Sequence, residues 1–119
     1  MNEDAKNLHN FYSYIKENFP SQERFGLRDG YIYSNFVRKI RFEFFLTNKK
    51  IGLKYPIANI PETKVTSLDN IILGLDEKFV HKSYNPTPRN KYHIWELPTK
   101  GLDYEEIMNM IIKFENIFH

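Results

Sequence analysis

Four histidines give this chain its widest chemical range, because imidazole can transfer protons or bind metal ions near neutral pH. They are His9, His81, His93 and His119. No two of them have the H-x-x-x-H or H-E-x-x-H spacing that places two imidazoles on one helical face. The chain has no cysteine, which excludes thiolate metal sites, disulfides and cysteine nucleophiles. We therefore predict neither a metal site nor a cofactor.

Two of these histidines could meet if their segments pair as neighbouring strands. His81 and Ser83 form an H-x-[ST] unit, which is similar to the paired units of 2H-type phosphoesterases. The second unit is incomplete, because Trp95 stands two residues after His93. Glu96 is the nearest candidate acid. A histidine-based phosphodiesterase is therefore an alternative function for this chain.

A second alternative is a metal-dependent nuclease that uses Glu62 and Lys64, the E-x-K half of such a motif. That chemistry needs a glutamate within a strand and a metal-binding acid upstream. Pro61 interrupts the strand, and Asp29 lies across the predicted hairpin. The chain also lacks a G-x-S-x-G elbow, a P-loop and a Rossmann glycine pattern, so the sequence favours a protein without catalysis.

Cationic and aromatic side chains gather between residues 38 and 54. Single-stranded nucleic-acid platforms use this combination, because cations bind phosphates and rings stack on bases. Lysines on an exposed strand edge also prevent edge-to-edge pairing, so a protective role remains open. The candidate binding residues here are Arg38, Lys39, Arg41, Phe45, Lys49, Lys50 and Lys54, flanked by Tyr31 or Tyr33.

The segment 85–98, NPTPRNKYHIWELP, contains the only tryptophan of the chain. Its prolines stiffen a polar loop that leads into a strand. We expect Trp95 to fill the core beside the last helix, with its N–H bonded to one partner. The loop contributes further candidate binding residues, which are Tyr84, Arg89, Lys91 and Tyr92.

The composition indicates a single folded domain over residues 1–119. Hydrophobic residues make up 41% of the chain and aromatic residues 16%, which is enough to build one core. The net charge of +2 is too small for a dedicated duplex binder and has the wrong sign for an acidic nucleic-acid mimic. No signal-peptide pattern and no apolar run long enough to span a membrane are present, so we expect a soluble cytoplasmic protein.

Hydrophobic periodicity predicts a helix near each end of the chain and one short helix between them. The first covers residues 4–19 and ends at Pro20. The last begins with Asp103 as N-cap and Glu106 at the capping-box position. Between them, Ser67 could cap a short helix that ends at Gly74.

Alternating apolar residues predict the strands. Residues 31–36 form one strand, and residues 40–57 form a β-hairpin that turns at TNKK. Shorter strands are expected near residue 80 and over 92–97, whereas residues 21–30 have the composition of turns. The order predicts an α+β domain with a mainly antiparallel sheet, a central β-hairpin, and N- and C-terminal helices packed on one face.

The hairpin KIRFEFFLTNKKIGLKY, the later YHIWEL and the closing GLDYEEIMNMIIKF are similar to small MmcQ/YjbR-like domains and to related uncharacterised domains associated with defence genes. Lys91, His93 and Trp95 stand where such domains have a basic or aromatic strand, although Ile94 separates the last two. The resemblance implies a compact α+β fold and a nucleic-acid or defence context.

These observations favour a small non-catalytic binding module for a macromolecular partner, either a protein complex or a nucleic acid. The abundance of Asn, Lys, Ile, Tyr and Phe is typical of A/T-rich coding DNA. This composition suits a protein of a low-GC bacterium or of its phage. One such protein would be an inhibitor of a host defence complex. We expect no membrane association, and a homo-oligomer remains open.

Overall fold

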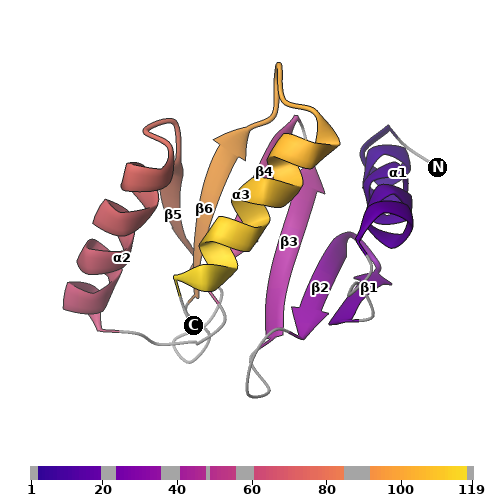
Figure 1. Cartoon of the computed structure of the whole chain (residues 1–119). Helices are drawn as coiled ribbons and strands as arrows, with labels where there is room; N and C mark the ends of the chain where they lie inside the picture. Colours follow the sequence, from indigo (N-terminus) through magenta and orange to yellow (C-terminus); the bar gives the residue numbers. More distant parts are fainter. Residues whose placement is uncertain are drawn as a thin grey trace.

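The computed structural model describes residues 3–19, 24–35, 41–47, 49–55, 61–84 and 92–117. These residues form three helices and six strands, as the α+β prediction requires (Figure 1). In chain order the elements are α1 (Glu3–Asn18), β1 (Phe25–Arg28), β2 (Tyr31–Asn35), β3 (Arg41–Thr47), β4 (Lys50–Lys54), α2 (Glu62–Leu75), β5 (Val80–Tyr84), β6 (Tyr92–Pro98) and α3 (Tyr104–Asn116).

The six strands form one sheet in the order β1-β2-β3-β4-β6-β5, and every neighbouring pair is antiparallel. The predicted β-hairpin is confirmed at its centre as β3 and β4. There Phe44 pairs with Leu53, and Leu46 pairs with Ile51. The β6 strand enters between β4 and β5, where Leu53 pairs with Trp95.

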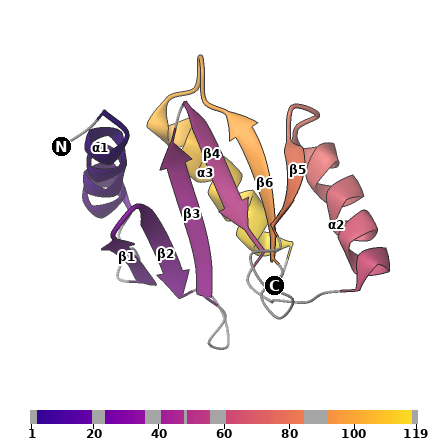
Figure 2. The same cartoon turned by 180° about the vertical axis from the view of Figure 1, so that it is seen from behind.

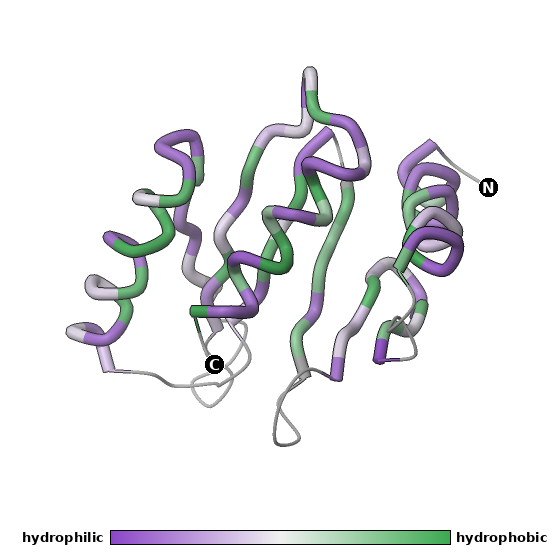
Figure 3. Tube along the Cα trace, in the orientation of Figure 1, coloured by the Kyte–Doolittle hydropathy of each residue, from purple (hydrophilic) through white to green (hydrophobic). Residues whose placement is uncertain are grey.

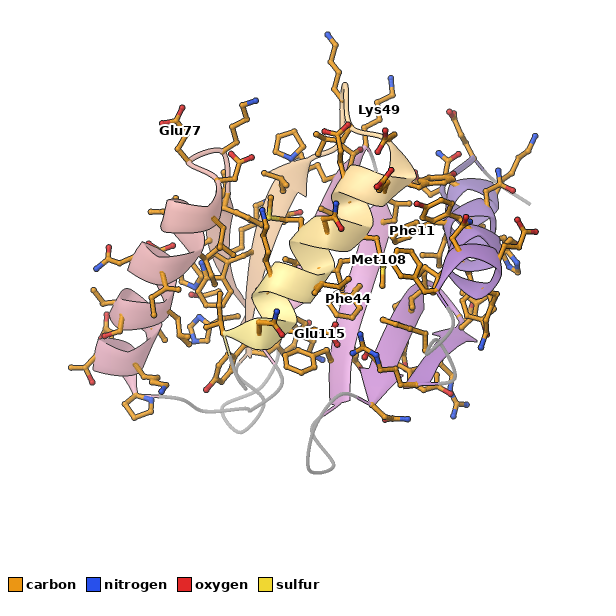
Figure 4. All side chains as sticks on the ribbon, viewed as in Figure 1. Phe11, Phe44, Lys49, Glu77, Met108 and Glu115 are labelled. Atoms are coloured by element: carbon orange, nitrogen blue, oxygen red, sulfur yellow. The ribbon has the colours of Figure 1, made fainter. Side chains whose placement is uncertain are left out.

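All three helices lie on one face of the sheet, which we call the helix side. Figure 1 shows α3 in front of β4 and β6, and Figure 2 shows the same strands in front of α3. A ring contact joins the two layers, since Phe42 of β3 meets Phe114 of α3 at 6.0 Å between centroids. Within the helix layer, Phe11 of α1 meets Tyr104 of α3 at 5.3 Å. In Figure 4, Phe11, Phe44 and Met108 lie in this interior.

The terminal helices form as predicted because their apolar residues recur at helical spacing. Leu8, Phe11 and Ile15 are the buried residues of α1. At the start of α3, Asp103 accepts a 2.8 Å hydrogen bond from the backbone N–H of Glu106, which confirms the predicted N-cap. Hydrophobic and hydrophilic residues are mixed along α3 in Figure 3, since only one side of this helix is buried.

The turn prediction for residues 21–30 was wrong in part. Phe25–Arg28 is strand β1, which pairs with β2 in the register Gly26 to Tyr33. Gly26 does not mark a bend. It is buried under the ring of Tyr33, and a Cβ atom at this position would overlap that ring. The turn itself lies at Gly30, whose φ of 86° favours glycine.

The predicted start of the middle helix was also wrong. The α2 helix begins at Glu62 after Pro61, five residues before Ser67. The Ser67 hydroxyl donates to the carbonyl oxygen of Thr63 within the helix, so it does not cap it. Pro61 is the N-cap residue with an extended backbone (φ −60°, ψ 145°), and its missing N–H removes no hydrogen bond of the helix because the first backbone N–H groups have no partner within it. None of the helices in the described ranges combines the length and apolar composition of a membrane span.

Candidate functional site

The face of the sheet opposite the helices is the first candidate site, and we call it the open face. No helix in the described ranges covers it (Figure 2). Because side chains alternate along a strand, residues that are paired in register project on the same side. The open face includes Arg28, Tyr31, Tyr33, Glu43, Phe45, Lys50, Gly52, Lys54, Val80, Lys82, Tyr92, Ile94 and Glu96.

An apolar strip crosses the centre of the open face. The rings of Tyr31 and Phe45 lie 5.7 Å apart, and both are partly exposed. Gly52 is buried between neighbours, since a Cβ atom there would lie 3.6 Å from Cβ of Phe45 and 3.3 Å from Cγ2 of Ile94. At the β5 edge, Val80 is 54% exposed. The strip therefore presents an aromatic and aliphatic surface to a binding partner.

Charged side chains on the open face neutralise one another. Lys54 Nζ lies 2.9 Å from Glu43 Oε2, and Lys82 Nζ lies 2.7 Å from Glu96 Oε1. Lys54 also lies over the ring of Tyr92, at 4.4 Å from its centroid, which is a cation–π contact. Lys54 and Lys82 are thus engaged by carboxylates and a ring of the same face.

The structure brings together only some of the predicted binding residues. Phe45, Lys50, Lys54 and Tyr92 share the open face. Lys49 stands apart in the β3–β4 turn with a φ of 59° (Figure 4). It lines a pocket of about 200 Å³ together with Tyr104 and Ile107.

The other predicted binding residues cannot be placed on a surface. Arg38, Lys39, Arg89 and Lys91 lie outside the described residues. Of Arg41 and Tyr84 only the backbone is described: Arg41 pairs with Asn35, and Tyr84 pairs with Tyr92.

The second candidate site is a pair of histidines on the helix side. His81 Nε2 and His93 Nδ1 are 2.8 Å apart, so one ring donates an N–H to the other. Ser83 Oγ lies 3.3 Å from the same nitrogen of His93. The sequence-based expectation that the two histidines meet across paired strands is confirmed, because His81 pairs with Trp95 and Ser83 pairs with His93.

The histidine pair rests on Trp95. The rings of His81 and Trp95 are 4.8 Å apart, and the two histidine rings are stacked at 5.0 Å. Trp95 is fully buried. Its N–H donates a hydrogen bond to Asp69 of α2, which is the one partner that we expected for it. Burial, together with the neighbouring His81, lowers the pKa of His93 below its ordinary value.

Two details of the catalytic alternatives were wrong. Glu96 projects from the open face and pairs with Lys82, so it lies across the sheet from the histidines. Glu62 and Lys64 are exposed in the first turn of α2, where an E-x-K motif needs a strand. In the described part of the chain, no group of three or more His, Asp or Glu residues is placed to hold a metal ion.

Sequence reasoning missed a buried ionic cluster at the C-terminal end of α3. Glu115 is fully buried, and its Oε2 accepts hydrogen bonds from Arg24 at 2.7 Å and from Ser34 at 2.8 Å (Figure 4). Burial raises the pKa of Glu115, and the bonds from Ser34 and Arg24 oppose the rise. The cluster ties α3 to β2, so we assign it to stability. The long sequence separations give no local pattern that predicts it.

Comparison of the chain with family models, with curated proteins and with solved structures found no match. The likeness to MmcQ/YjbR-like domains thus stays a prediction.

Proposed function

We propose that this chain is a non-catalytic binding module whose open face receives a protein partner. The observation that carries this proposal is a sheet face without a covering helix in the described ranges, crossed by partly exposed aromatic and aliphatic residues. Antiparallel sheets commonly leave one face to solvent, but that face is then polar. Tyr31, Phe45 and Ile94 depart from this pattern at its centre.

The charges favour a protein over a nucleic acid as the partner. A phosphate-binding surface needs cations that are available to the ligand. Here Lys54 and Lys82 already contact Glu43 and Glu96. Aromatic residues are enriched in the central part of a protein–protein interface, where charged residues are few. The amino-acid composition is typical of A/T-rich coding DNA and suits a protein of a phage or a low-GC bacterium. A host defence complex is therefore the first class of partner to test.

The test is capture from a nuclease-treated extract of a low-GC bacterium on immobilised protein. Phe45→Ser and Ile94→Ser remove apolar surface from the open face. Ile71→Ser is the matched control, because Ile71 is 50% exposed on α2. We expect wild type and the control to retain the same protein and the two open-face variants to lose it. Circular dichroism melting verifies that all variants fold.

Two results would reject the protein-binding proposal. One is equal capture by all four proteins. The other is a partner that is captured from an untreated extract but not from the nuclease-treated one, combined with binding of a labelled 20-mer of single-stranded DNA or RNA. In that case the logarithm of affinity should fall steeply with the logarithm of salt concentration, with a slope set by the number of neutralised phosphates.

The histidine pair supports a second candidate function, a small phosphodiesterase. The supporting observation is the proximity of Ser83, His81 and His93, two potential proton carriers beside a hydroxyl group. Wild type and His93→Ala should be incubated with labelled RNA, DNA and cyclic nucleotides, with and without Mn²⁺. Turnover that His93→Ala abolishes supports this candidate, and no turnover of any substrate dismisses it.

A further inference from the structure

The separation of the two histidine nitrogens fits a hydrogen bond and also fits the binding of one metal ion by both rings. Two nitrogens bound at right angles to one metal ion lie about 2.8–3.0 Å apart when each metal–nitrogen bond is about 2.0–2.1 Å. Tetrahedral coordination with the same bonds spreads them to about 3.3 Å. Nε2 of His81 and Nδ1 of His93 are 2.8 Å apart.

The surrounding sheet holds this spacing in place. The two histidines project from strands that are paired along their length, and the His81 ring stacks on the fully buried Trp95. Binding of one ion requires that the shared proton moves to the other nitrogen of its ring and that both rings turn until their lone pairs meet at the ion. The pairing of β5 with β6 keeps the two histidines adjacent throughout.

The site is accessible to solvent, and an ion held by two histidines would keep further coordination positions open. Both rings are partly exposed, and the exposed Ser83 has its hydroxyl 3.3 Å from His93 Nδ1. No third His, Asp or Glu joins the pair within the described ranges. Imidazole ligands without carboxylates favour first-row transition ions over Mg²⁺ and Ca²⁺, and right-angled positions favour Cu²⁺ and Ni²⁺ over tetrahedral Zn²⁺.

We propose that His81 and His93 form a two-histidine site for a divalent transition ion of the Cu²⁺ or Ni²⁺ class, with solvent in the remaining coordination positions. The site lies on the helix side. It is therefore separate from the open face and independent of the protein-binding proposal.

The only tryptophan of the chain provides a direct readout. Trp95 lies 4.8 Å from the His81 ring and 6.4 Å from the His93 ring, between ring centroids. A paramagnetic ion bound to both histidines quenches indole emission at this range. We expect Cu²⁺ or Ni²⁺ to produce saturable quenching of Trp95 that EDTA reverses.

Variants separate this site from general binding to surface histidines. His81→Phe keeps a ring on Trp95 but removes the ligand, and His93→Ala removes the other ligand. Each should raise the ion concentration at half-quenching by about tenfold or more, since one of two ligands is lost. His9→Ala is the control, because His9 is exposed on α1 and should leave quenching unchanged.

Three results would overturn the proposal. They are the absence of saturable quenching in wild type, equal quenching in wild type and His81→Phe, and a His9→Ala effect as large as that of His93→Ala. Thermal melting followed by circular dichroism checks that each variant is folded. His81→Phe decides the case if His93→Ala proves unfolded.

Discussion

The indole N–H of Trp95 donates a 2.9 Å hydrogen bond to Oδ1 of Asp69, and this bond joins β6 to α2. Trp95 is fully buried, so its N–H depends on that carboxylate. A buried donor without a partner costs about 1–3 kcal/mol. We therefore expect Asp69→Ala to lower the free energy of unfolding by about that amount in urea denaturation.

Asp69→Asn is the matched variant, because its amide oxygen can still accept the bond. It should retain most of the wild-type stability. Equal losses in Asp69→Ala and Asp69→Asn would show that the negative charge, rather than the hydrogen bond, matters at this position.

The raised pKa of Glu115 predicts a particular pH dependence. Burial is the main cause of the rise above the ordinary value of 4.5, so the folded protein holds this proton more tightly than the unfolded chain. The contribution of this group to stability is therefore greatest below pH 4.5 and declines as pH rises through the folded-state pKa.

Glu115→Gln removes this titration. The stability of Glu115→Gln relative to wild type should consequently increase as pH rises above 4.5. Urea denaturation of both proteins across a pH series measures the difference. A relative stability that decreases with pH would show that the ion pair with Arg24 outweighs the burial of the carboxylate.

The N-cap of α3 gives a third prediction. Asp103 Oδ1 accepts the backbone N–H of Glu106 at 2.8 Å. Loss of such a cap costs about 0.5–2 kcal/mol, so Asp103→Ala should lower the free energy of unfolding within that range. Asp103→Ser should restore much of it in the same denaturation assay. A neutral Asp103→Ala result would mean that packing of the helix alone fixes its start.

A fourth prediction tests why the open face should reject nucleic acid. Glu43→Gln together with Glu96→Gln removes both carboxylates that contact Lys54 and Lys82. These ion pairs are partly exposed, so each substitution should cost less than about 1 kcal/mol of stability. The double variant should gain salt-dependent binding of a single-stranded 20-mer, measured by fluorescence anisotropy, that wild type lacks.

Wild-type binding of the same strength would contradict that argument. It would show that the carboxylates do not shield the lysines from phosphates, and it would favour a nucleic-acid partner.

Local patterns predicted most of the fold. The apolar spacing of α1 and α3 and the alternation in β3, β4 and β6 depend on neighbours along the chain, which a sequence displays directly. The β1 strand was not predicted because it is short and contains Gly26, a residue that normally marks a turn. The reason for that glycine is the Tyr33 ring on the next strand.

The candidate sites were less predictable because their residues meet across strands. The sequence showed that Phe45, Lys54 and Tyr92 could belong to a binding surface, but it did not show Glu43 beside Lys54. It suggested the meeting of His81 and His93, and it offered Glu96 as the nearby acid although alternation along the strand places Glu96 on the other face. The pairing between β4, β5 and β6 determines which of these side chains become neighbours. The sequence of a single strand does not specify the register of that pairing.

The position of β6 between β4 and β5 has a kinetic consequence. The ladders β1–β2, β2–β3, β3–β4 and β5–β6 each join strands that follow one another in the chain, whereas β4–β6 joins strands separated by α2 and β5. Loop closure costs more entropy as the intervening chain lengthens. Strands β1–β4 and the pair β5–β6 can thus each assemble early. The docking of β6 against β4, where Ile51 pairs with Leu97, is the step expected to limit the rate of folding.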